Sequence, residues 1–232
     1  MIASVLSKKI AAGSTHVVLD MPVGPTAKVR SEESAQALSA GLVTVAEAFG
    51  MRARVCIGDG RQPIGRGIGP ALEANDVLAV LQGAKDAPAD LRARAVALAG
   101  SLLELGGIEP AGNGVATARL ALEDGRAWAK FQRICEAQGG MRTPPTSTQR
   151  RPLTSSQSGS LVAIDNRKIA KVAKLAGAPE AKAAGVELHV KRGDAISVGQ
   201  PQCTVHADAP GELDYALGYA AANPGIFGVK EQ

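Results

Sequence analysis

The chain has 232 residues, enough to bury a substantial core and to form one large domain or a medium domain with a small companion. One Trp, two Tyr and three Phe are its only aromatic side chains, so the core must rest on Ala, Val, Leu and Ile, and stacking on nucleic-acid bases is disfavoured. The 26 basic and 22 acidic side chains give a net charge of +4, which is small and scattered and argues against a nucleic-acid partner.

The cysteines and the opening segment indicate the compartment. Cys56, Cys135 and Cys203 are far apart, with no C-x-x-C pair and no nearby histidine, and we interpret them as reduced thiols of a cytoplasmic protein. No apolar stretch approaches the roughly 20 residues that span a bilayer. Lys8 and Lys9 interrupt the apolar start of the chain, so neither a signal peptide nor a membrane partner is expected.

The first predicted elements are a helix, a strand and a second helix. Residues 1–11 predict an amphipathic helix, because apolar and polar side chains fall on opposite faces at 100° per residue. This helix has no Ser, Thr, Asp or Asn at its start to cap it. A strand over 16–20 and a loop over 22–30 follow. Ser31 is expected to cap a helix that Gly50 ends.

A second strand, over 52–57, completes a strand–helix–strand unit, so the two strands should be parallel with a right-handed crossover. Loops that leave the carboxyl ends of parallel strands meet at one edge of the sheet, where α/β proteins bind ligands. Here these loops are 22–30 and the glycine-rich 58–69, which ends at Pro70, a favourable first helical residue. The pattern predicts a ligand site at this edge.

The rest of the chain predicts three helices, a linker and a small α+β domain. The helices are expected over 70–82, 89–105 and 115–137. Residues 139–158 are rich in Pro, Ser, Thr and Arg and lack apolar periodicity, which is typical of a linker or an exposed loop. Beyond them we expect short strands over 159–165, 185–191, 195–199 and 202–206, and a helix over 211–222. The predicted fold class is α/β, with a mixed or parallel sheet flanked by helices, followed by the small α+β domain.

Five polar residues are candidates for binding a ligand. Ser4 and Lys8 lie one helical turn apart and can offer a hydrogen bond and a positive charge to one ligand, although a solvated polar face is the simpler interpretation. Lys28 lies at the ligand edge, where an ammonium can meet a phosphate, or it is a surface lysine. Asp59 and Arg61 lie in the glycine-rich loop, whose G-x-G-x-G spacing is not the dinucleotide fingerprint.

Catalytic patterns are missing from the residues themselves. No Ser-His-Asp order, paired carboxylates or His-rich metal pattern is recognisable. Residues 190–201 look like the strand–turn–strand of biotinyl and lipoyl carrier domains, but a carrier needs a modifiable lysine at a hairpin tip. Lys168, between Arg167 and Ile169, does not fit that pattern.

Four segments in order resemble the thymidine phosphorylase and pyrimidine-nucleoside phosphorylase family, in its carboxyl-terminal part. They are residues 3–9 (ASVLSKK), 18–24 (VLDMPVG), 62–73 (QPIGRGIGPALE) and the carboxyl-terminal segment, which looks like the barrel-sandwich domain of these proteins. The resemblance implies a pentosyltransferase, in which phosphate attacks the anomeric carbon of a nucleoside or nucleoside 5′-monophosphate and releases the base. Residues 22–28 (PVGPTAK) look like the AMP phosphorylase subgroup, which makes thymidine itself doubtful as the substrate.

The resemblance also implies roles for single residues. By the match, Ser4 contacts the substrate near the base, Lys8 faces a pyrimidine carbonyl, and Lys28 is the substrate-binding lysine of AMP phosphorylases. The co-substrate would be inorganic phosphate, and no organic cofactor is implied.

A monovalent-cation site, suited to potassium, is implied as well. It would consist of the carbonyls of Ile64 and Gly67 and the carboxylate of Asp76, which match such a site in some pyrimidine phosphorylases.

Family members carry further parts ahead of the segment that matches residue 1, namely most of a helical domain, the phosphate loop and the acid that protonates the leaving base. Residues 1–13 would then be a remnant of that helical domain, 14–140 the central α/β domain, 141–158 a linker and 159–232 the carboxyl-terminal domain. We therefore expect no catalytic residue in this chain and little turnover by it alone, since phosphate must be held in line for reaction. The full-length form would be a homodimer. The alternative is a non-catalytic nucleotide-binding or assembly module derived from the family.

Overall fold

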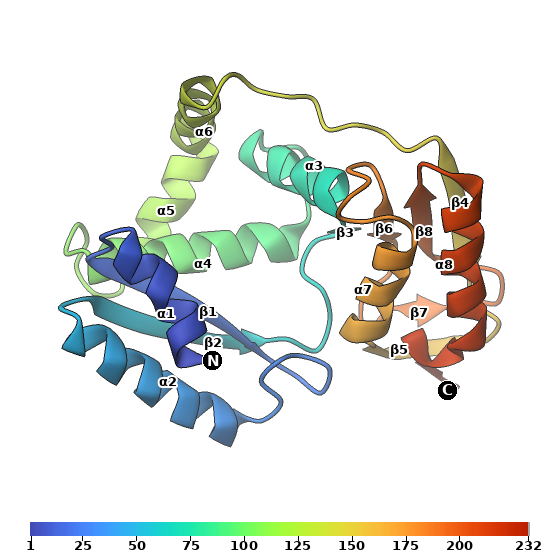
Figure 1. The fold of residues 1–232 in the computed structure, drawn as a ribbon, viewed down its shortest axis with the longest axis horizontal. Helices are drawn as coiled ribbons and strands as arrows, with labels where there is room; N and C mark the ends of the chain where they lie inside the picture. Colours follow the sequence, from blue (N-terminus) through green and yellow to red (C-terminus); the bar gives the residue numbers. More distant parts are fainter. Residues whose placement is uncertain (232) are drawn as a thin grey trace. The chain divides into compact units, whose positions relative to one another are not determined.

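A computed structural model describes residues 1–231 and has a mixed α/β architecture. The chain divides into two compact units (Figure 1). The first consists of Met1–Gly60 and Arg92–Lys130, and the second of Arg61–Leu91 and the chain from Phe131 onward. None of the helices within residues 1–231 combines the length and apolarity that crossing a bilayer requires.

The first unit is built on a parallel pair of strands, β1 (His16–Val23) and β2 (Arg52–Asp59). They are joined through α2 (Glu32–Ala48), and the helix α1 (Ile2–Ala11) packs against α2. The predicted strand–helix–strand unit with parallel strands is therefore confirmed. Its core joins apolar side chains of both helices and both strands, among them Leu6, Leu19 and Leu42.

Local sequence signals set the ends of α2 as predicted. The side-chain oxygen of Ser31 accepts the N–H of Ser34 at 3.2 Å, which satisfies one of the amides left free at a helix start. Gly50 follows the helix with φ +71°, a conformation that glycine adopts without steric cost.

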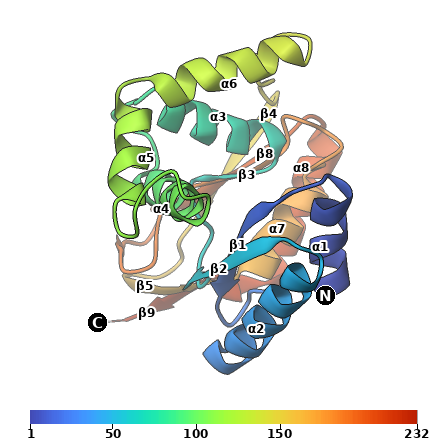
Figure 2. The ribbon, with the colours of Figure 1, turned by 90° about the vertical axis from the view of Figure 1, so that its left-hand side faces the viewer.

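The remaining helices of this region are α4 (Ala89–Leu105), α5 (Gly114–Glu123) and α6 (Arg126–Ala137). Figures 1 and 2 show α2 and α4 on opposite sides of the two strands. The prediction of one helix over 115–137 was wrong, because Gly125 has φ +82° and breaks it into α5 and α6. The Asp124 carboxylate accepts the N–H of Arg126 at 3.1 Å and so caps the new helix start.

The second unit contains two antiparallel sheets. One has the strand order β3-β6-β8-β4 and the other β7-β5-β9. The bounds of the first are β3 (Gly67–Ile68), β6 (Gly185–Leu188), β8 (Pro201–Ala207) and β4 (Gln149–Thr154). Those of the second are β7 (Ala195–Ile196), β5 (Gly159–Ile164) and β9 (Phe227–Lys230).

Helices cover these sheets and complete the core of the second unit. They are α3 (Pro70–Leu81), α7 (Asn166–Leu175), α8 (Pro210–Ala222) and a short 3₁₀ turn, Pro224–Ile226. Helices α7 and α8 pack side by side (Figure 1). One apolar core runs through both sheets and both helices, with Leu161, Ile169 and Val205 fully buried. This is the small α+β domain that the sequence predicts, with α7 and β9 as additional elements.

The compact units differ from the predicted boundaries at two places. Residues 61–91 were expected in the central domain, yet they belong to the second unit, because β3 pairs with β6 and the N–H of Ala71 donates to the carbonyl of Lys182 at 3.0 Å. The segment expected as a linker, 141–158, contains a strand. Gln149–Thr154 forms β4, whose backbone pairs with β8 despite the polar composition of the strand.

Candidate functional site

The carboxyl ends of β1 and β2 lie side by side, at the edge where we predict a ligand site. Val23 lies opposite Asp59 in the parallel register, and the N–H of Gly60 donates to the Val23 carbonyl at 2.8 Å. The N–H of Gly24 donates to the carbonyl of Val29 at 3.1 Å, so the loop after β1 closes on itself. Both strand ends are thereby fixed next to each other before any ligand arrives.

An ion pair fastens α4 to this edge of the sheet. The Asp20 carboxylate on β1 accepts hydrogen bonds from the Nε (3.0 Å) and Nη2 of Arg94, a bidentate geometry that fixes the planar guanidinium. The same guanidinium lies directly against Gly58, where any Cβ would collide with it. Glycine at position 58 therefore makes room for the pair. No local sequence pattern indicates this pair, since its members lie 74 residues apart.

The three substrate-binding residues that the family resemblance implied are all exposed. Ser4 and Lys8 lie on the solvent side of α1, whose opposite face buries Leu6. Lys28 is exposed in the loop between β1 and α2. Within residues 1–231 no hydrogen bond or ion pair joins these three side chains to one another. Their hydroxyl and ammonium groups are open to a ligand, and their roles stay predictions.

The glycine-rich loop 61–69 is organised around Asp76 on α3. The Oδ2 atom of Asp76 accepts the N–H groups of Arg66 (2.6 Å) and Gly67 (2.8 Å), and Oδ1 accepts Arg66 Nε at 3.2 Å. The Asp76 residue is 5% exposed, so these donors compensate the burial of its charge. The Cβ of a larger residue at Gly65 would meet this carboxylate, and the φ of +76° there favours glycine as well.

Two of the three residues expected to form a cation site, Gly67 and Asp76, contact each other at this loop. Gly67 lies next to Asp76, but its N–H rather than its carbonyl faces the carboxylate. No cluster of three or more His, Cys, Asp or Glu side chains suited to a metal occurs in the described part of the chain, residues 1–231. The cation role of these three residues stays a prediction.

A second cationic group contacts the same loop. The Lys191 ammonium donates to the carbonyl oxygens of Pro63 (3.0 Å) and Gly65 (2.6 Å) and to Asp90 Oδ2 (2.7 Å). Burial alone would raise the pKa of Asp90, but the Lys191 ammonium and the N–H groups of Leu91 and Gly65 outweigh it and hold that pKa below its usual value. The N–H of Arg192 adds a hydrogen bond to Gln62 Oε1 at 2.8 Å.

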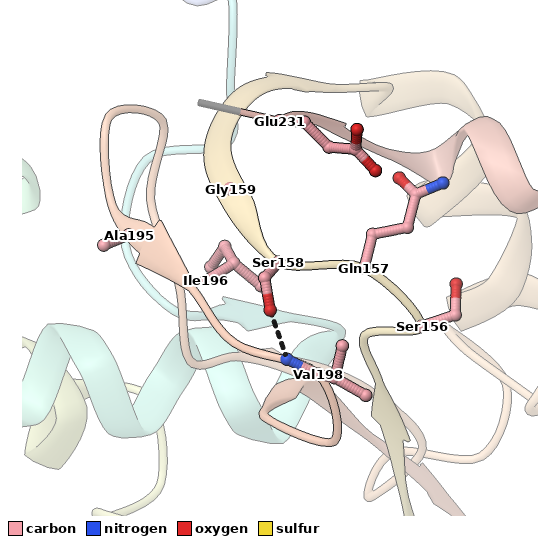
Figure 3. A pocket seen from close by; sticks show the side chains of 8 residues that line it. All are labelled: Ser156, Gln157, Ser158, Gly159, Ala195, Ile196, Val198 and Glu231. Carbon is pink, nitrogen blue, oxygen red and sulfur yellow. Dashed lines mark hydrogen bonds between the residues drawn. The ribbon is translucent and has the colours of Figure 1, made fainter.

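A pocket of about 620 Å³ opens between the segments Ser156–Gly159 and Ala195–Val198 (Figure 3). The Ser158 side-chain oxygen accepts the N–H of Val198 at 3.1 Å and so joins its two walls. The side chains of Gln157 and Glu231 approach each other at one side of it (Figure 3). No acid–base pair or activated nucleophile is recognisable among the residues that line it.

Lys168, the lysine considered as a carrier site, lies on a helix. Its backbone N–H donates to the capping carboxylate of Asp165 at 3.0 Å, in the first turn of α7. A modifiable lysine would need a hairpin tip instead.

His206 is the most buried of the three histidines and lies on β8. Its Nδ1 is 3.0 Å from the Ser147 hydroxyl oxygen, and its Nε2 is 3.5 Å from Glu187 Oε2. Burial and the charge of Arg150 hold the pKa of His206 below its usual value, although Glu187 acts in the opposite direction. Ser147 and His206 are 7% and 5% exposed, so this group supports the sheet and is closed to a substrate.

Comparison with known proteins connects these features to a family. Residues 160–226 match the Pyrimidine nucleoside phosphorylase C-terminal domain. Over all 232 residues the chain is 58% identical to the "Putative thymidine phosphorylase 1" of Acidovorax sp. (strain JS42), and it covers 45% of that protein. It is 61% identical over 222 residues, or 96% of its length, to the "Putative thymidine phosphorylase" of Sphingopyxis alaskensis, of which it covers 43%. Over its whole length the chain is therefore similar to the carboxyl-terminal part of proteins named as thymidine phosphorylases.

The chain thus spans less than half the length of these phosphorylase relatives and corresponds to their carboxyl-terminal part. The resemblance found in the sequence is confirmed at the level of the family. What sequence reasoning missed are the Asp20–Arg94 pair and the contacts of Lys191, because both depend on residues far apart in the chain. The only local signal for them was the glycine content of the two loops.

Proposed function

We propose that this chain forms part of a pentosyltransferase that cleaves a nucleoside or a nucleoside 5′-monophosphate with inorganic phosphate. The observation that carries the proposal is the 58% identity to a thymidine phosphorylase-named protein along the whole chain. In this reaction a phosphate oxygen forms a bond to the anomeric carbon while the bond from that carbon to the base breaks. The base leaves with a proton, and the other product is a pentose 1-phosphate or 1,5-bisphosphate.

Within that enzyme, the first unit would bind the substrate and the ligand edge would position it. Ser4 offers a hydroxyl and Lys8 a positive charge, one helical turn apart on α1, to the polar groups of the base. Lys28 offers a point charge from the loop after β1. The Asp20–Arg94 pair holds the strand beneath that loop in place, and such preorganisation raises the rate of a reaction between bound partners.

The substrate class that we favour is a nucleoside 5′-monophosphate. Residues 22–28 (PVGPTAK) end in the exposed Lys28, whose ammonium suits a phosphate group of the substrate. A substrate without a 5′-phosphate would gain nothing from this contact. The enzyme should therefore cleave AMP faster than adenosine or thymidine at the same low concentration.

The test is phosphate-dependent release of base from AMP, thymidine and uridine. Because the chain covers 45% of the Acidovorax relative, it is assayed alone and joined to the preceding part of that relative. We expect the joined protein to release base only with phosphate present, and to form one pentose phosphate for each base. Folded joined protein that releases no base from any of the three substrates would overturn the proposal. If it binds AMP without cleaving it, a non-catalytic nucleotide-binding module is the better account.

Single substitutions in the joined protein test the assigned residues. Loss of a hydrogen bond to a charged group costs about 1.5–3 kcal/mol, so Lys28→Met should lower kcat/KM for AMP at least about tenfold. Adenosine or thymidine cleavage should change much less. Ser4→Ala should lower kcat/KM for all substrates. Ser7→Ala, which removes another exposed hydroxyl from the same helix, should leave kcat/KM unchanged. Equal effects of Ser4→Ala and Ser7→Ala would contradict the role of Ser4.

A further inference from the structure

The ammonium of Lys191 is saturated by oxygen acceptors. A lysine ammonium has three N–H donors. In this structure they meet three acceptors, the carbonyl oxygens of Pro63 and Gly65 and the Oδ2 atom of Asp90, at 2.6 to 3.0 Å. Two of these oxygens belong to the backbone of the glycine-rich loop. The cationic group therefore lies where three oxygens from two segments converge.

The position of Lys191 is itself fixed by the turn that carries it. Its backbone N–H donates to Asp194 Oδ2 at 2.7 Å, and the N–H of Gly193 donates to the carbonyl of Leu161, a fully buried residue of β5, at 2.8 Å. The lysine side chain thus extends from a rigid turn toward the loop. Because the backbone is already fixed, contact with the loop costs only the side-chain freedom of the lysine.

The loop is shaped to present these oxygens. Gly65 has φ +76°, and its N–H donates to Asp90 Oδ2 at 3.3 Å while its carbonyl accepts from Lys191. Two carbonyl dipoles and a carboxylate pointing at one place repel one another unless a positive charge lies between them. The fold therefore needs a cation at this place, and Lys191 supplies it.

We propose that Lys191 acts as a built-in monovalent cation of the glycine-rich loop, and that its three oxygen partners form a latent site for a free ammonium or potassium ion. Oxygen ligands suit hard cations. The only charged ligand is Asp90, so one positive charge balances the site, and a magnesium ion would require a more complete octahedral set. This site uses Pro63, Gly65 and Asp90, and it is separate from the one expected at Ile64, Gly67 and Asp76.

A free ion has a route to the three oxygens. Asp90 and Lys191 line a pocket of about 560 Å³ on the second unit, together with Gln62, Arg66 and His189. The side chains of Lys191 and Asp90 are 29% and 37% exposed. Removal of the ammonium would leave the three oxygens open to water and to dissolved ions.

Thermal unfolding of the whole chain tests this proposal. The variant Lys191→Met keeps most of the apolar stem and removes the charge. We expect its Tm to fall by about 5 °C in tetramethylammonium chloride, because two carbonyls and a carboxylate lose their partner. Ammonium or potassium chloride at the same ionic strength should restore at least half of the loss, with saturation, as binding to the folded state requires.

Matched variants separate this effect from a general salt effect. Wild-type protein should give the same Tm in all three salts. So should Lys182→Met, which removes an exposed ammonium that contacts the single carbonyl of Pro179 at 2.9 Å. Adding Asp90→Asn to Lys191→Met should abolish the recovery by ammonium and potassium. If Lys191→Met responds to the three salts as the wild type does, the proposal is wrong.

A refolding experiment covers the case in which Lys191→Met is unfolded in tetramethylammonium chloride. Dilution from urea into ammonium chloride should then give folded protein by circular dichroism, whereas dilution into tetramethylammonium chloride should not. Failure to fold in both salts would also overturn the proposal.

Discussion

Lys8 and Lys28 of the first unit and Lys191 of the second hold their positive charges in opposite ways. In the first unit, Lys8 and Lys28 are exposed around a small sheet of two parallel strands. In the second unit, Lys191 is bound to three oxygens beside a larger core of two antiparallel sheets and two helices. A lysine open to solvent is available for a ligand, while a lysine with all donors occupied serves the fold. In the first unit the lysines that we predict to bind substrate are open to solvent, whereas the lysine beside the larger core of the second unit is held by the fold.

The largest expected effect concerns the core of the second unit. Leu161 is 0% exposed, and Leu161→Ala should lower the free energy of unfolding of that unit by about 2–5 kcal/mol, because it removes buried methyl groups and leaves a cavity. Urea unfolding measures the change. The matched control is Val162→Ala on the same strand, whose side chain is 44% exposed. A loss no greater for Leu161→Ala than for the control would contradict a well-packed core here.

The next effect concerns the anchor of the glycine-rich loop. Asp76→Asn retains the shape of the side chain but loses acceptor capacity for the N–H groups of Arg66 and Gly67. We expect the free energy of unfolding to fall by about 1–3 kcal/mol and hydrogen exchange at these two amides to become faster. Asn75→Ala, at the exposed neighbouring position, should change neither quantity. Unchanged exchange at both amides would show that Asp76 does not hold the loop.

In the first unit, a smaller loss is expected from the helix cap of α2. Ser31→Ala removes the oxygen that accepts the N–H of Ser34, which should cost about 1 kcal/mol. Ser31→Asp keeps an acceptor at the cap and should retain the wild-type stability. If the two variants unfold at the same urea concentration, the cap does not stabilise this unit.

The smallest effect depends on pH. The pKa of Asp90 is lowered from its ordinary 3.8, so its contribution to stability is complete above that value and is lost as the pH falls through the lower folded value. Urea unfolding between about pH 5 and pH 3 should show this loss for the wild type. Asp90→Asn should be less stable at the upper end of the range and should lose less on acidification. A parallel decline of both proteins would contradict the role of the Asp90–Lys191 pair.

Local signals predicted much of this fold. Ser31 and Gly50 marked the ends of α2, and strand–helix–strand spacing gave the parallel pairing of β1 and β2. Segments that pair with distant parts of the chain were harder to predict from the sequence. Gln149–Thr154 looks like a linker because β4 gains its stability from pairing with β8, more than forty residues later in the register. Gly125 was visible in the sequence, but apolar periodicity on both sides hid the break between α5 and α6.

Prediction of the candidate site from the sequence was likewise limited to local signals. Ser4, Lys8 and Lys28 were found because they lie in short segments that resemble a family, and the structure finds all three exposed. The Asp20–Arg94 and Asp90–Lys191 pairs span 74 and 101 residues, and no local pattern connects their members. Only the folded chain reveals which charges meet.

The most direct test of the central claim is the appearance of free base from AMP in the presence and absence of inorganic phosphate, with the chain joined to the preceding part of its Acidovorax relative. The account predicts base and pentose bisphosphate in equal amounts with phosphate, no base without it, and a strong reduction by Lys28→Met. Base release that does not require phosphate, or that Lys28→Met leaves unchanged, would contradict it.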